Sequence, residues 1–290
     1  MVVNDKEIKV SGKIIKIAEL KEEWDVDIED PETFIRDLKR NGIKADIFTF
    51  MQRLPESKPR FNYYMEWDSI AAIPITTYDY WIKKQVVQNS RKKIGLAQRK
   101  GVTVRPMDFN DELVKGILDI YHETPLLQGK PNRQYRTDFE TAKRLNSTFL
   151  DRAQFIGAFY EGELIAYIKL VRAGKFMRTM GILAKTAHRE KGAMNLLVAK
   201  AVEICVEKKM PYLIYAKFKY GKTGSLTLME FKRNLGFESI ILPRYYVPLN
   251  IIGKVILKLK LHREMVEYLP EKMVRKLLEM RTRWYEKKYS

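Results

Sequence analysis

The chain has 290 residues, of which 46% are hydrophobic and 11% aromatic, so it can form one large domain or two modest ones. This composition is typical of a folded globular protein and excludes a largely disordered one. The formal net charge of +18 predicts a polyanionic partner, such as a nucleic acid, a phosphorylated cofactor or an anionic lipid surface. The alternative is a basic soluble protein without such a partner.

Cysteine content and the N-terminal residues indicate the compartment. The single cysteine, Cys205, excludes an intrachain disulfide, and the first 30 residues are too charged for a secretory signal. We therefore expect a cytoplasmic protein. No window approaches the ~18–20 uncharged apolar residues of a membrane span, which leaves peripheral attachment to a membrane open.

Residues 1–77 are predicted to form a small N-terminal α/β region. Residues 6–20 alternate loosely between apolar and polar side chains and predict one or two strands. A short helix is expected to begin at Asp30-Pro31-Glu32 and to end at Asn41-Gly42. Aromatic and aliphatic runs interrupted by prolines predict further strands, over residues 45–54 and 60–75.

Residues 78–100 are predicted to form one basic helix that connects two regions. Ile82, Val86, Ile94 and Ala97 fall on one helical face, and seven lysines and arginines surround them. The pattern fits a solvated basic helix with an apolar seam, and it fits equally a helix that faces a polyanion.

Residues 101–249 are predicted to form one α+β domain. A first strand is followed by two helices, the first of which Asn110 opens. The turn Glu161-Gly162-Glu163 then joins two strands of a three-stranded meander. After the meander we expect a helix, a strand, a helix and a final strand pair, over residues 192–208, 212–218, 225–235 and 238–247.

Residues 250–290 are predicted to form a basic amphipathic helical tail. Met273, Leu277, Met280 and Trp284 make an apolar stripe, and residues 251–290 hold 11 lysines and arginines against five glutamates. Such a stripe can pack on the protein's own core, on a partner, on RNA or on a membrane. A peripheral contact with anionic membrane through residues 251–290 is therefore one expected role.

Metal and nucleophile motifs are missing from the sequence. His122, His188 and His262 lie far apart without ligand spacing, and no G-x-S-x-G elbow occurs, so we predict no metal site. Residues 216–223 fit a relaxed phosphate-loop pattern. Large side chains at positions 217–220 disfavour it, because such a loop wraps phosphates with successive backbone N–H groups.

The turn between the strand at 176–186 and the helix at 192–208 is the better anion-binding candidate. It combines basic residues, a glycine and the first N–H groups of a helix, which together favour bound phosphate. An ordinary strand-to-helix turn is the alternative. The predicted cofactor-binding residues are Lys185, Arg189, Lys191, Gly192, Ala193 and Asn195.

Four stretches of the sequence resemble the GNAT superfamily of acyltransferases, and in particular its FemAB-like branch. They are YDYWIKKQVVQNSRKKIGLAQRKGVTVR, FIGAFYEGELIAYIKLV, EKGAMNLLVAKAVEICVEKK and LMEFKRNLGF. The resemblance implies a mixed, mostly antiparallel twisted sheet flanked by helices, with two strands that splay apart to admit the acyl donor. It also leaves residues 1–77 open as a degenerate GNAT-like lobe.

The resemblance implies an N-acyltransferase that uses acyl-CoA or aminoacyl-tRNA as donor and an amine as acceptor. Arg189, Gly192 and Ala193 occupy the turn that reads R/Q-x-x-G-x-G/A in acetyltransferases, but Met194 stands where a small residue is expected. That departure weakens acetyl-CoA as donor. FemAB-like relatives commonly use aminoacyl-tRNA, which suits the net charge of +18.

Candidate catalytic residues follow from the same resemblance. Glu123 lies in the loop that borders the acceptor site in GNAT folds and is the expected base or substrate contact. His122 in the same loop is an expected substrate-binding residue. Tyr220 and Lys217, at the end of the splayed strand, are expected either to donate a proton to the leaving group or to hold an anionic substrate. Because the next predicted helix, over residues 225–235, has no tyrosine, where GNAT enzymes often place one for this role, the general acid stays unassigned. The alternative function is a non-catalytic nucleic-acid-binding protein built on a degenerate transferase fold.

Overall fold

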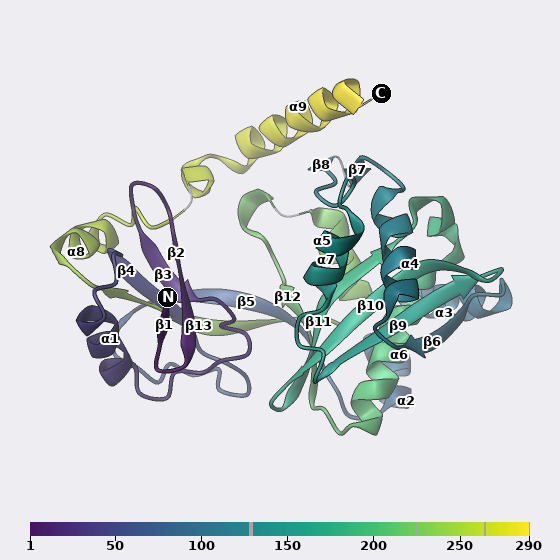
Figure 1. Ribbon diagram of the computed structural model, residues 1–290, viewed down its shortest axis with the longest axis horizontal. Coiled ribbons are helices and arrows are strands. Elements are labelled where there is room, and N and C mark those ends of the chain that lie inside the picture. Colours follow the sequence, from purple (N-terminus) through teal and green to yellow (C-terminus); the bar gives the residue numbers. More distant parts are fainter. Residues whose placement is uncertain (128–129, 224, 264, 290) are drawn as a thin grey trace. The chain divides into compact units, whose positions relative to one another are not determined.

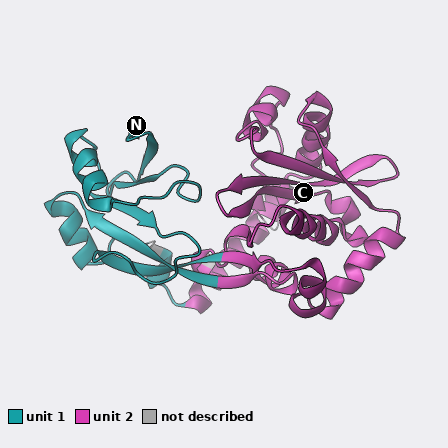
Figure 2. Ribbon diagram, turned by 90° about the horizontal axis from the view of Figure 1, so that it is seen from below, with its two compact units in different colours: residues 1–70, 240–270 teal, residues 71–239, 271–290 magenta. Residues whose placement is uncertain are grey.

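The computed structural model describes residues 1–127, 130–223, 225–263 and 265–289 (Figure 1). Its contacts divide the chain into two compact units, each formed from two stretches of sequence (Figure 2). Unit 1 holds residues 1–70 and 240–270, and unit 2 holds residues 71–239 and 271–290. The borders differ from the four expected segments, because the C-terminal tail is shared between the two units.

Unit 1 is built on a sheet in which β3 and β4 are parallel and the pairs β1–β2, β2–β3 and β4–β13 are antiparallel. Helix α1 (Pro31–Arg40) connects the two parallel strands. The Asp30 carboxylate accepts a hydrogen bond from the Thr33 amide (3.1 Å), as the sequence predicted for the start of this helix. The strands of the unit, in spatial order, are β1 (Val2–Val3), β2 (Lys6–Ser11), β3 (Ile17–Leu20), β4 (Ile47–Met51), β13 (Glu238–Pro248) and β5 (Tyr64–Pro74).

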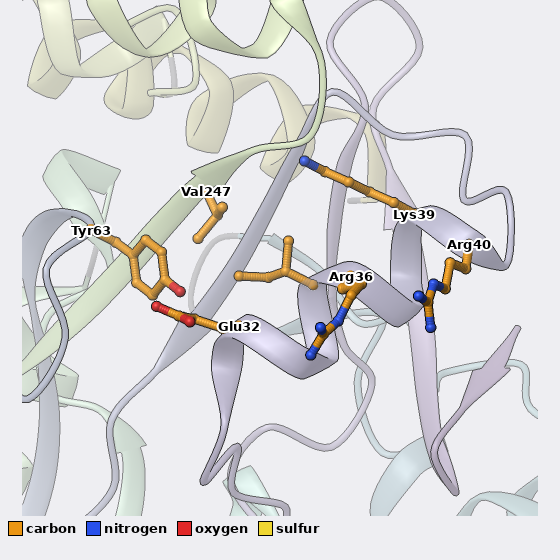
Figure 3. A pocket seen from close by; sticks show the side chains of 7 residues that line it. Glu32, Arg36, Lys39, Arg40, Tyr63 and Val247 are labelled. Carbon is orange, nitrogen blue, oxygen red and sulfur yellow. The ribbon is translucent and has the colours of Figure 1, made fainter.

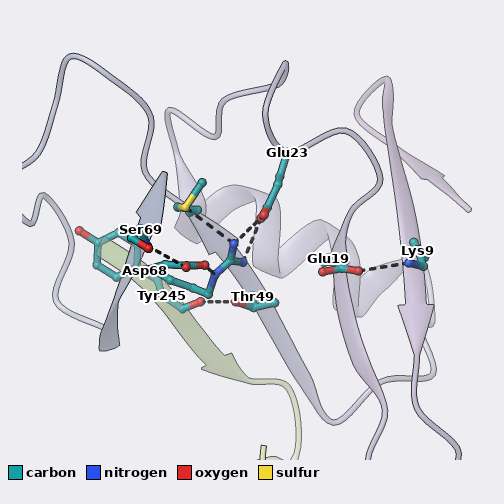
Figure 4. A network of polar contacts seen from close by, with 9 residues as sticks. Lys9, Glu19, Glu23, Thr49, Asp68, Ser69 and Tyr245 are labelled. Carbon is teal, nitrogen blue, oxygen red and sulfur yellow. Dashed lines mark hydrogen bonds and ion pairs between the residues drawn. The ribbon is translucent and has the colours of Figure 1, made fainter. Parts of the chain in front are cut away.

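Arg244 is a buried charge in unit 1. Two carboxylates neutralise it, those of Glu23 and Asp68, which Figure 4 labels. Its Nη2 donates to Glu23 at 2.6 Å and its Nε to Asp68 at 2.9 Å. Burial alone lowers the pKa of the guanidinium, but Glu23 and Asp68 outweigh this effect and raise the pKa above its usual value. The three side chains join β13 to β5 and to the segment after β3.

Unit 2 is built on a mixed, mostly antiparallel sheet, which confirms the predicted fold class. Strands β6, β9, β10 and β11 pair antiparallel in the spatial order β6-β9-β10-β11, and β12 pairs with β11 in parallel. Residues 71–74 of β5 belong to this unit and lie beside β12. The strands are β6 (Thr103–Met107), β9 (Ala153–Tyr160), β10 (Glu163–Ala173), β11 (Phe176–Ala184) and β12 (Tyr212–Lys217).

Helices cover both faces of this sheet. On one face, α6 (Ala193–Glu207) packs on side chains such as Ile156 and Ile165, with α3 (Gln88–Arg99) beside it. On the other face, α4 (Asp111–His122) packs on Phe155 and Leu164, with α5 (Phe139–Asn146) beside it. Successive strand residues thus serve opposite faces. The remaining short elements are β7 (Leu126–Leu127), β8 (Lys130–Pro131), η2 (Thr186–Lys191), η3 (Gly221–Thr223) and α7 (Leu226–Asn234).

The prediction of one continuous helix over 78–100 is wrong. The segment forms α2 (Tyr78–Tyr80) and a π-helical turn, η1 (Trp81–Gln85), and becomes extended at Val86 and Val87 before α3 begins. The buried Trp81 indole donates to the Leu235 carbonyl (2.9 Å), and the Val87 amide donates to the Asn234 carbonyl (3.1 Å). These contacts with the end of α7, together with two β-branched residues, outweigh helix propensity.

The predicted final strand pair is also one strand, β13, which residues of both units share. The tail contains α8 (Ile251–Lys258), η4 (Met265–Tyr268) and α9 (Glu271–Tyr289). The predicted apolar stripe of α9 is at least half exposed, whereas Val274 is buried. No helix in the described part of the chain is both long and apolar enough to cross a bilayer.

The Arg244 cluster generates a stability prediction. Arg244→Met leaves the Glu23 and Asp68 carboxylates without their cation, so the free energy of unfolding should fall by about 3–5 kcal/mol. Lys9→Met removes an exposed pair with Glu19 (3.5 Å) and should cost less than about 1 kcal/mol. Urea unfolding followed by circular dichroism measures both variants. Equal losses would contradict the buried role of Arg244.

Candidate functional site

The central feature of unit 2 is a short parallel ladder between β11 and β12. It joins Phe176 to Tyr212, Met177 to Leu213 and Arg178 to Ile214. Beyond Arg178, β11 continues to Ala184 against β10, and β12 continues to Lys217. The two strands therefore part after three residue pairs, as the resemblance implied.

A β-bulge in β11 lies where the strands part. Lys169 of β10 pairs with Gly181 and Leu170 pairs with Thr179, so Met180 is the extra residue. Thr179 is opposite Leu170, a member of the hydrophobic cluster on the α6 side, and therefore faces that side of the sheet. The Thr179 hydroxyl is buried without a hydrogen-bond partner among the described residues, and Thr179 is only 8% exposed. A buried polar group without a partner is costly, and a ligand between the strands can satisfy it.

The end of β12 is held by a buried lysine on α7. Lys232 is 0% exposed, and its Nζ donates to the Lys217 carbonyl. The same Nζ lies 4.6 Å from the Tyr215 ring centre and 4.9 Å from the Tyr220 ring centre. Burial lowers the pKa of Lys232 to about 8 and raises that of Tyr215 to about 12.

The predicted residues Tyr220 and Lys217 therefore meet at Lys232. Tyr220 is partly exposed, and burial of its hydroxyl raises its pKa, so the hydroxyl keeps its proton at neutral pH. Lys217 contributes its carbonyl to the cluster. Phe218 packs in the hydrophobic core, so residues 216–223 do not form an open loop of backbone N–H groups around a phosphate. This disfavours the relaxed phosphate-loop pattern further.

Glu123 holds the turn that follows β11. One of its carboxylate oxygens accepts from the Ala187 amide at 2.7 Å and the other accepts from the Thr186 amide. Glu123 therefore accepts hydrogen bonds from two amide groups at the beginning of η2, which are then not available to a ligand. Its neighbour His122 contacts the Thr137 carbonyl at 2.8 Å through Nε2, which ties the end of α4 to the segment before α5.

The β9–β10 hairpin engages two basic residues of the predicted anion-binding turn. Lys185 pairs with Glu163, and the hydrogen bond lowers the pKa of that carboxyl. The Lys191 Nζ lies 3.7 Å from the Tyr160 ring centre. These two cations therefore have partners within the protein, whereas Arg189 is exposed.

The turn leading into α6 packs against α3. Gly192 has φ +73°, and a Cβ added there would meet the Lys93 carbonyl at 3.2 Å, so glycine permits this close approach. Ala193 is buried, and the Asn195 amide donates to the Gly192 carbonyl at 3.1 Å. The Lys100 Nζ donates to the Glu190 carbonyl at 3.2 Å. The basic helix α3 thus borders the turn.

The structure groups the predicted residues in two places. Glu123, Lys185, Arg189, Lys191, Gly192, Ala193 and Asn195 belong to the turn between β11 and α6 or contact it, and Lys217 and Tyr220 belong to the end of β12. Sequence reasoning missed Thr179 and Lys232. The stretch LMEFKRNLGF, which contains Lys232, marked the region of α7, but only the tertiary contacts show that this lysine is buried.

Two further observations concern other kinds of site. No group of three or more His, Cys, Asp or Glu side chains in the described ranges could hold a metal ion. Unit 1 has a shallow cavity of about 480 Å³ beside α1, lined in part by Glu32, Tyr63 and Val247 (Figure 3). Arg36, Lys39 and Arg40 also line this cavity.

Comparison with known proteins supports the fold. Residues 115–237 match the sequence model of the Acetyltransferase (GNAT) family, whereas no curated protein matches the chain. The structure of L-PGS from Bacillus licheniformis is similar with a TM-score of 0.56 at 15% identity, over 88% of this chain and 85% of that chain.

Two other solved structures are similar. A conserved protein of unknown function from Bacteroides thetaiotaomicron gives a TM-score of 0.56 at 13% identity, over 82% of this chain and 80% of that chain. The C-terminal domain of a protein described as a lysylphosphatidylglycerol synthetase, from Agrobacterium fabrum, gives 0.54 at 14% identity, over 86% and 85%. These likenesses show the fold.

The contacts of Glu123 predict a structural effect. Glu123→Ala removes the acceptor for two turn amides and should lower the free energy of unfolding by about 1 kcal/mol. Asp119→Ala changes an exposed carboxylate on the same helix and should cost less than about 0.5 kcal/mol in thermal or urea unfolding. Glu123→Gln keeps one acceptor oxygen but cannot take a proton. Glu123→Gln turns an NH2 donor toward one of the two turn amides, so it should lose part of the stability that Glu123→Ala loses. If Glu123 is the base, Glu123→Gln also loses turnover at temperatures where it stays folded; if Glu123 only holds the turn, turnover survives there.

The pKa of Lys232 predicts a pH dependence of stability. Between pH 8 and its ordinary pKa of 10.5, this amine binds a proton in the unfolded chain but not in the folded one, so its contribution to stability rises with pH. Relative to Lys232→Met, the wild-type free energy of unfolding should rise by on the order of 1–2 kcal/mol from about pH 7 to about pH 10. In Lys208→Met, which changes an exposed lysine, the free energy of unfolding should vary with pH in parallel with that of the wild type. A Lys232→Met profile parallel to the wild type would contradict burial of the amine.

Proposed function

Residues 115–237 form a domain of the GNAT superfamily of acyltransferases, and we propose that the chain is an N-acyltransferase that uses acyl-CoA or aminoacyl-tRNA. The observation that carries this proposal is the short ladder between β11 and β12. Where two neighbouring strands part, their backbone N–H and C=O groups can hydrogen-bond a ligand instead of each other. The acyl end of the donor would lie there.

Charge beside the turn supports a donor that carries phosphates. The Lys100 ammonium at the end of α3 contacts the Glu190 carbonyl of the turn that contains Arg189, and Gly192 lets the turn approach the Lys93 carbonyl. The beginning of α6 adds the positive end of a helix dipole. Both CoA and the 3′ end of a tRNA carry phosphate groups, so this charge suits either donor.

The chemistry of the transfer requires three groups. The amine nitrogen attacks the acyl carbonyl, a new C–N bond forms, and the bond from the acyl carbon to the sulfur or oxygen of the donor breaks. Backbone N–H groups at the splay would polarise the carbonyl. The amine loses a proton to a base, for which Glu123 stays the predicted residue, and the leaving sulfur or oxygen gains one.

Tyr220 suits the role of proton donor to the leaving group. Its raised pKa keeps the hydroxyl protonated at neutral pH. The Lys232 Nζ, 4.9 Å from the Tyr220 ring centre, holds the adjacent Lys217 carbonyl and so fixes the end of β12 beside this tyrosine. Lys232 is therefore a positioning residue for the proposed site.

Thr179→Val tests where the donor binds. Because the buried hydroxyl has no hydrogen-bond partner in the described part of the chain, its loss should leave the stability unchanged or higher. If the donor satisfies the hydroxyl, donor affinity should fall about 3–10-fold in calorimetric titration. Val171→Ala at a neighbouring buried strand position is a contrast, since it should lower stability through a cavity without a specific loss of donor affinity.

The donor class is decided by parallel titrations with an acyl-CoA and with an aminoacyl-tRNA, each followed by a turnover assay for the free thiol or the deacylated tRNA. Steep salt dependence is expected for tRNA, because many phosphate contacts release counterions. Binding and turnover with one donor class identify it. Failure of both to bind, or RNA binding without turnover of any donor, would overturn the proposed acyltransferase activity.

A further inference from the structure

Helix α8 in unit 1 has apolar side chains on its outer face as well as on its inner face. Ile256 and Leu257 pack inward against Ile47. On the opposite side, large aliphatic side chains at i, i+1, i+4 and i+8 face outward, which places them on one face of the helix. They are Ile251 at 79% exposure, Ile252 at 62%, Val255 at 49% and Leu259 at 58%.

The beginning of α8 is fixed to the sheet. The Asn250 side chain accepts from the Gly253 amide (2.7 Å) and donates to the Asp46 carboxylate (3.1 Å). A Cβ on Gly253 would lie 2.0 Å from the Asp46 carbonyl oxygen, so only glycine permits the helix to approach this closely. The outer face is therefore held on a rigid support.

The segment after α8 is fixed as well. Arg263 donates to the Glu66 carboxylate through Nη2 at 2.7 Å, and His262 contacts the same carboxylate at 3.1 Å. The His262 ring lies 4.7 Å from that of Tyr246. With both ends anchored, α8 cannot turn its outer face inward without breaking these contacts.

The loop between β2 and β3 adds to this surface. Asp46 also accepts from the Lys16 amide at 2.8 Å, and Ile15 packs beside the cluster that contains Ile256 and Leu257. At the tip of the same loop, Ile14 is 95% exposed. An aliphatic side chain thus projects from a loop that Asp46 ties to the beginning of α8.

The charged side chains of α8 and of the β2–β3 loop are lysines, whereas the nearby Asp46 carboxylate is bonded to Asn250 and to the Lys16 amide. Residues 239–263 contain no Asp or Glu, and Lys254, Lys258 and Lys260 are interleaved with the exposed aliphatic residues. Lys13 and Lys16 flank Ile14. Aliphatic side chains with a lysine rim are suited to the boundary between lipid headgroups and acyl chains, where anionic headgroups attract the lysines.

We propose that the outer face of α8, together with Ile14, docks on an anionic lipid bilayer. The aliphatic side chains enter the acyl boundary and the lysines contact the headgroup phosphates. A nucleic acid would use the lysines but would leave the isoleucines in water, and a second copy of the chain would bring lysines against lysines. The bilayer satisfies both features of the surface.

Vesicle flotation of the full chain tests the proposal. The probes are vesicles of phosphatidylcholine alone and of an equal mixture of phosphatidylcholine and phosphatidylglycerol. The wild type should bind the anionic vesicles at least about tenfold more strongly than the neutral ones. Ile251→Gln/Ile252→Gln should reduce binding to anionic vesicles about tenfold or more.

Two further variants separate the contributions. Lys254→Gln/Lys258→Gln should weaken binding to anionic vesicles about tenfold and leave binding to neutral vesicles unchanged. Leu277→Gln/Met280→Gln, a matched pair of half-exposed apolar residues on α9, should change binding less than about twofold. If the isoleucine variant fails to fold by circular dichroism, the lysine variant decides.

Three outcomes would overturn the proposal. The first is that the wild type does not bind vesicles, and the second is that the α9 variant loses binding while the α8 variants keep it. The third is that the wild type forms a dimer in sedimentation velocity, does not bind vesicles, and becomes monomeric in the isoleucine variant. The flotation assay contains no acyl donor. Its result is therefore independent of the proposed acyl transfer.

Discussion

The separation of β11 and β12 is the constraint on which the proposed activity depends. Three pairs join the strands, and the β-bulge at Met180 and the contact of Lys232 with Lys217 lie where the two strands diverge. Each strand remains supported on its other side, β11 by β10 and β12 by β5. The opening therefore does not leave either strand as an unsupported edge, and the backbone can face a donor without loss of the fold.

Buried charge is used differently in the two units. In unit 1, Arg244 meets two carboxylates, so its charge is neutralised and it fastens three segments together. In unit 2, Lys232 meets a carbonyl and two aromatic rings, and burial lowers its pKa to about 8. The Arg244 guanidinium therefore keeps its charge near neutral pH, whereas the Lys232 amine can gain or lose its proton at a pH close to neutral.

Much of the local structure was predictable because short-range signals determine it. Asp30, Asn110 and Ser225 each accept an amide at the beginning of a helix, and the Glu161-Gly162-Glu163 turn joins β9 to β10. The errors arose where distant residues intervene. Trp81 and Val87 bond to the end of α7, about 150 residues later in the chain, and this contact breaks the helix expected over 78–100.

The sequence by itself determined the α+β class, the order of the elements, the resemblance to acyltransferases and the basic turn before α6, because periodicity, capping residues and motifs are properties of neighbouring residues. Only the tertiary structure decided that Glu123 holds this turn, that Lys100 at the end of α3 contacts it, that Lys232 is buried and that the outer face of α8 is exposed. The burial of a side chain and its hydrogen-bond partners depend on which distant segments of the chain come into contact, and local sequence patterns do not specify those tertiary contacts.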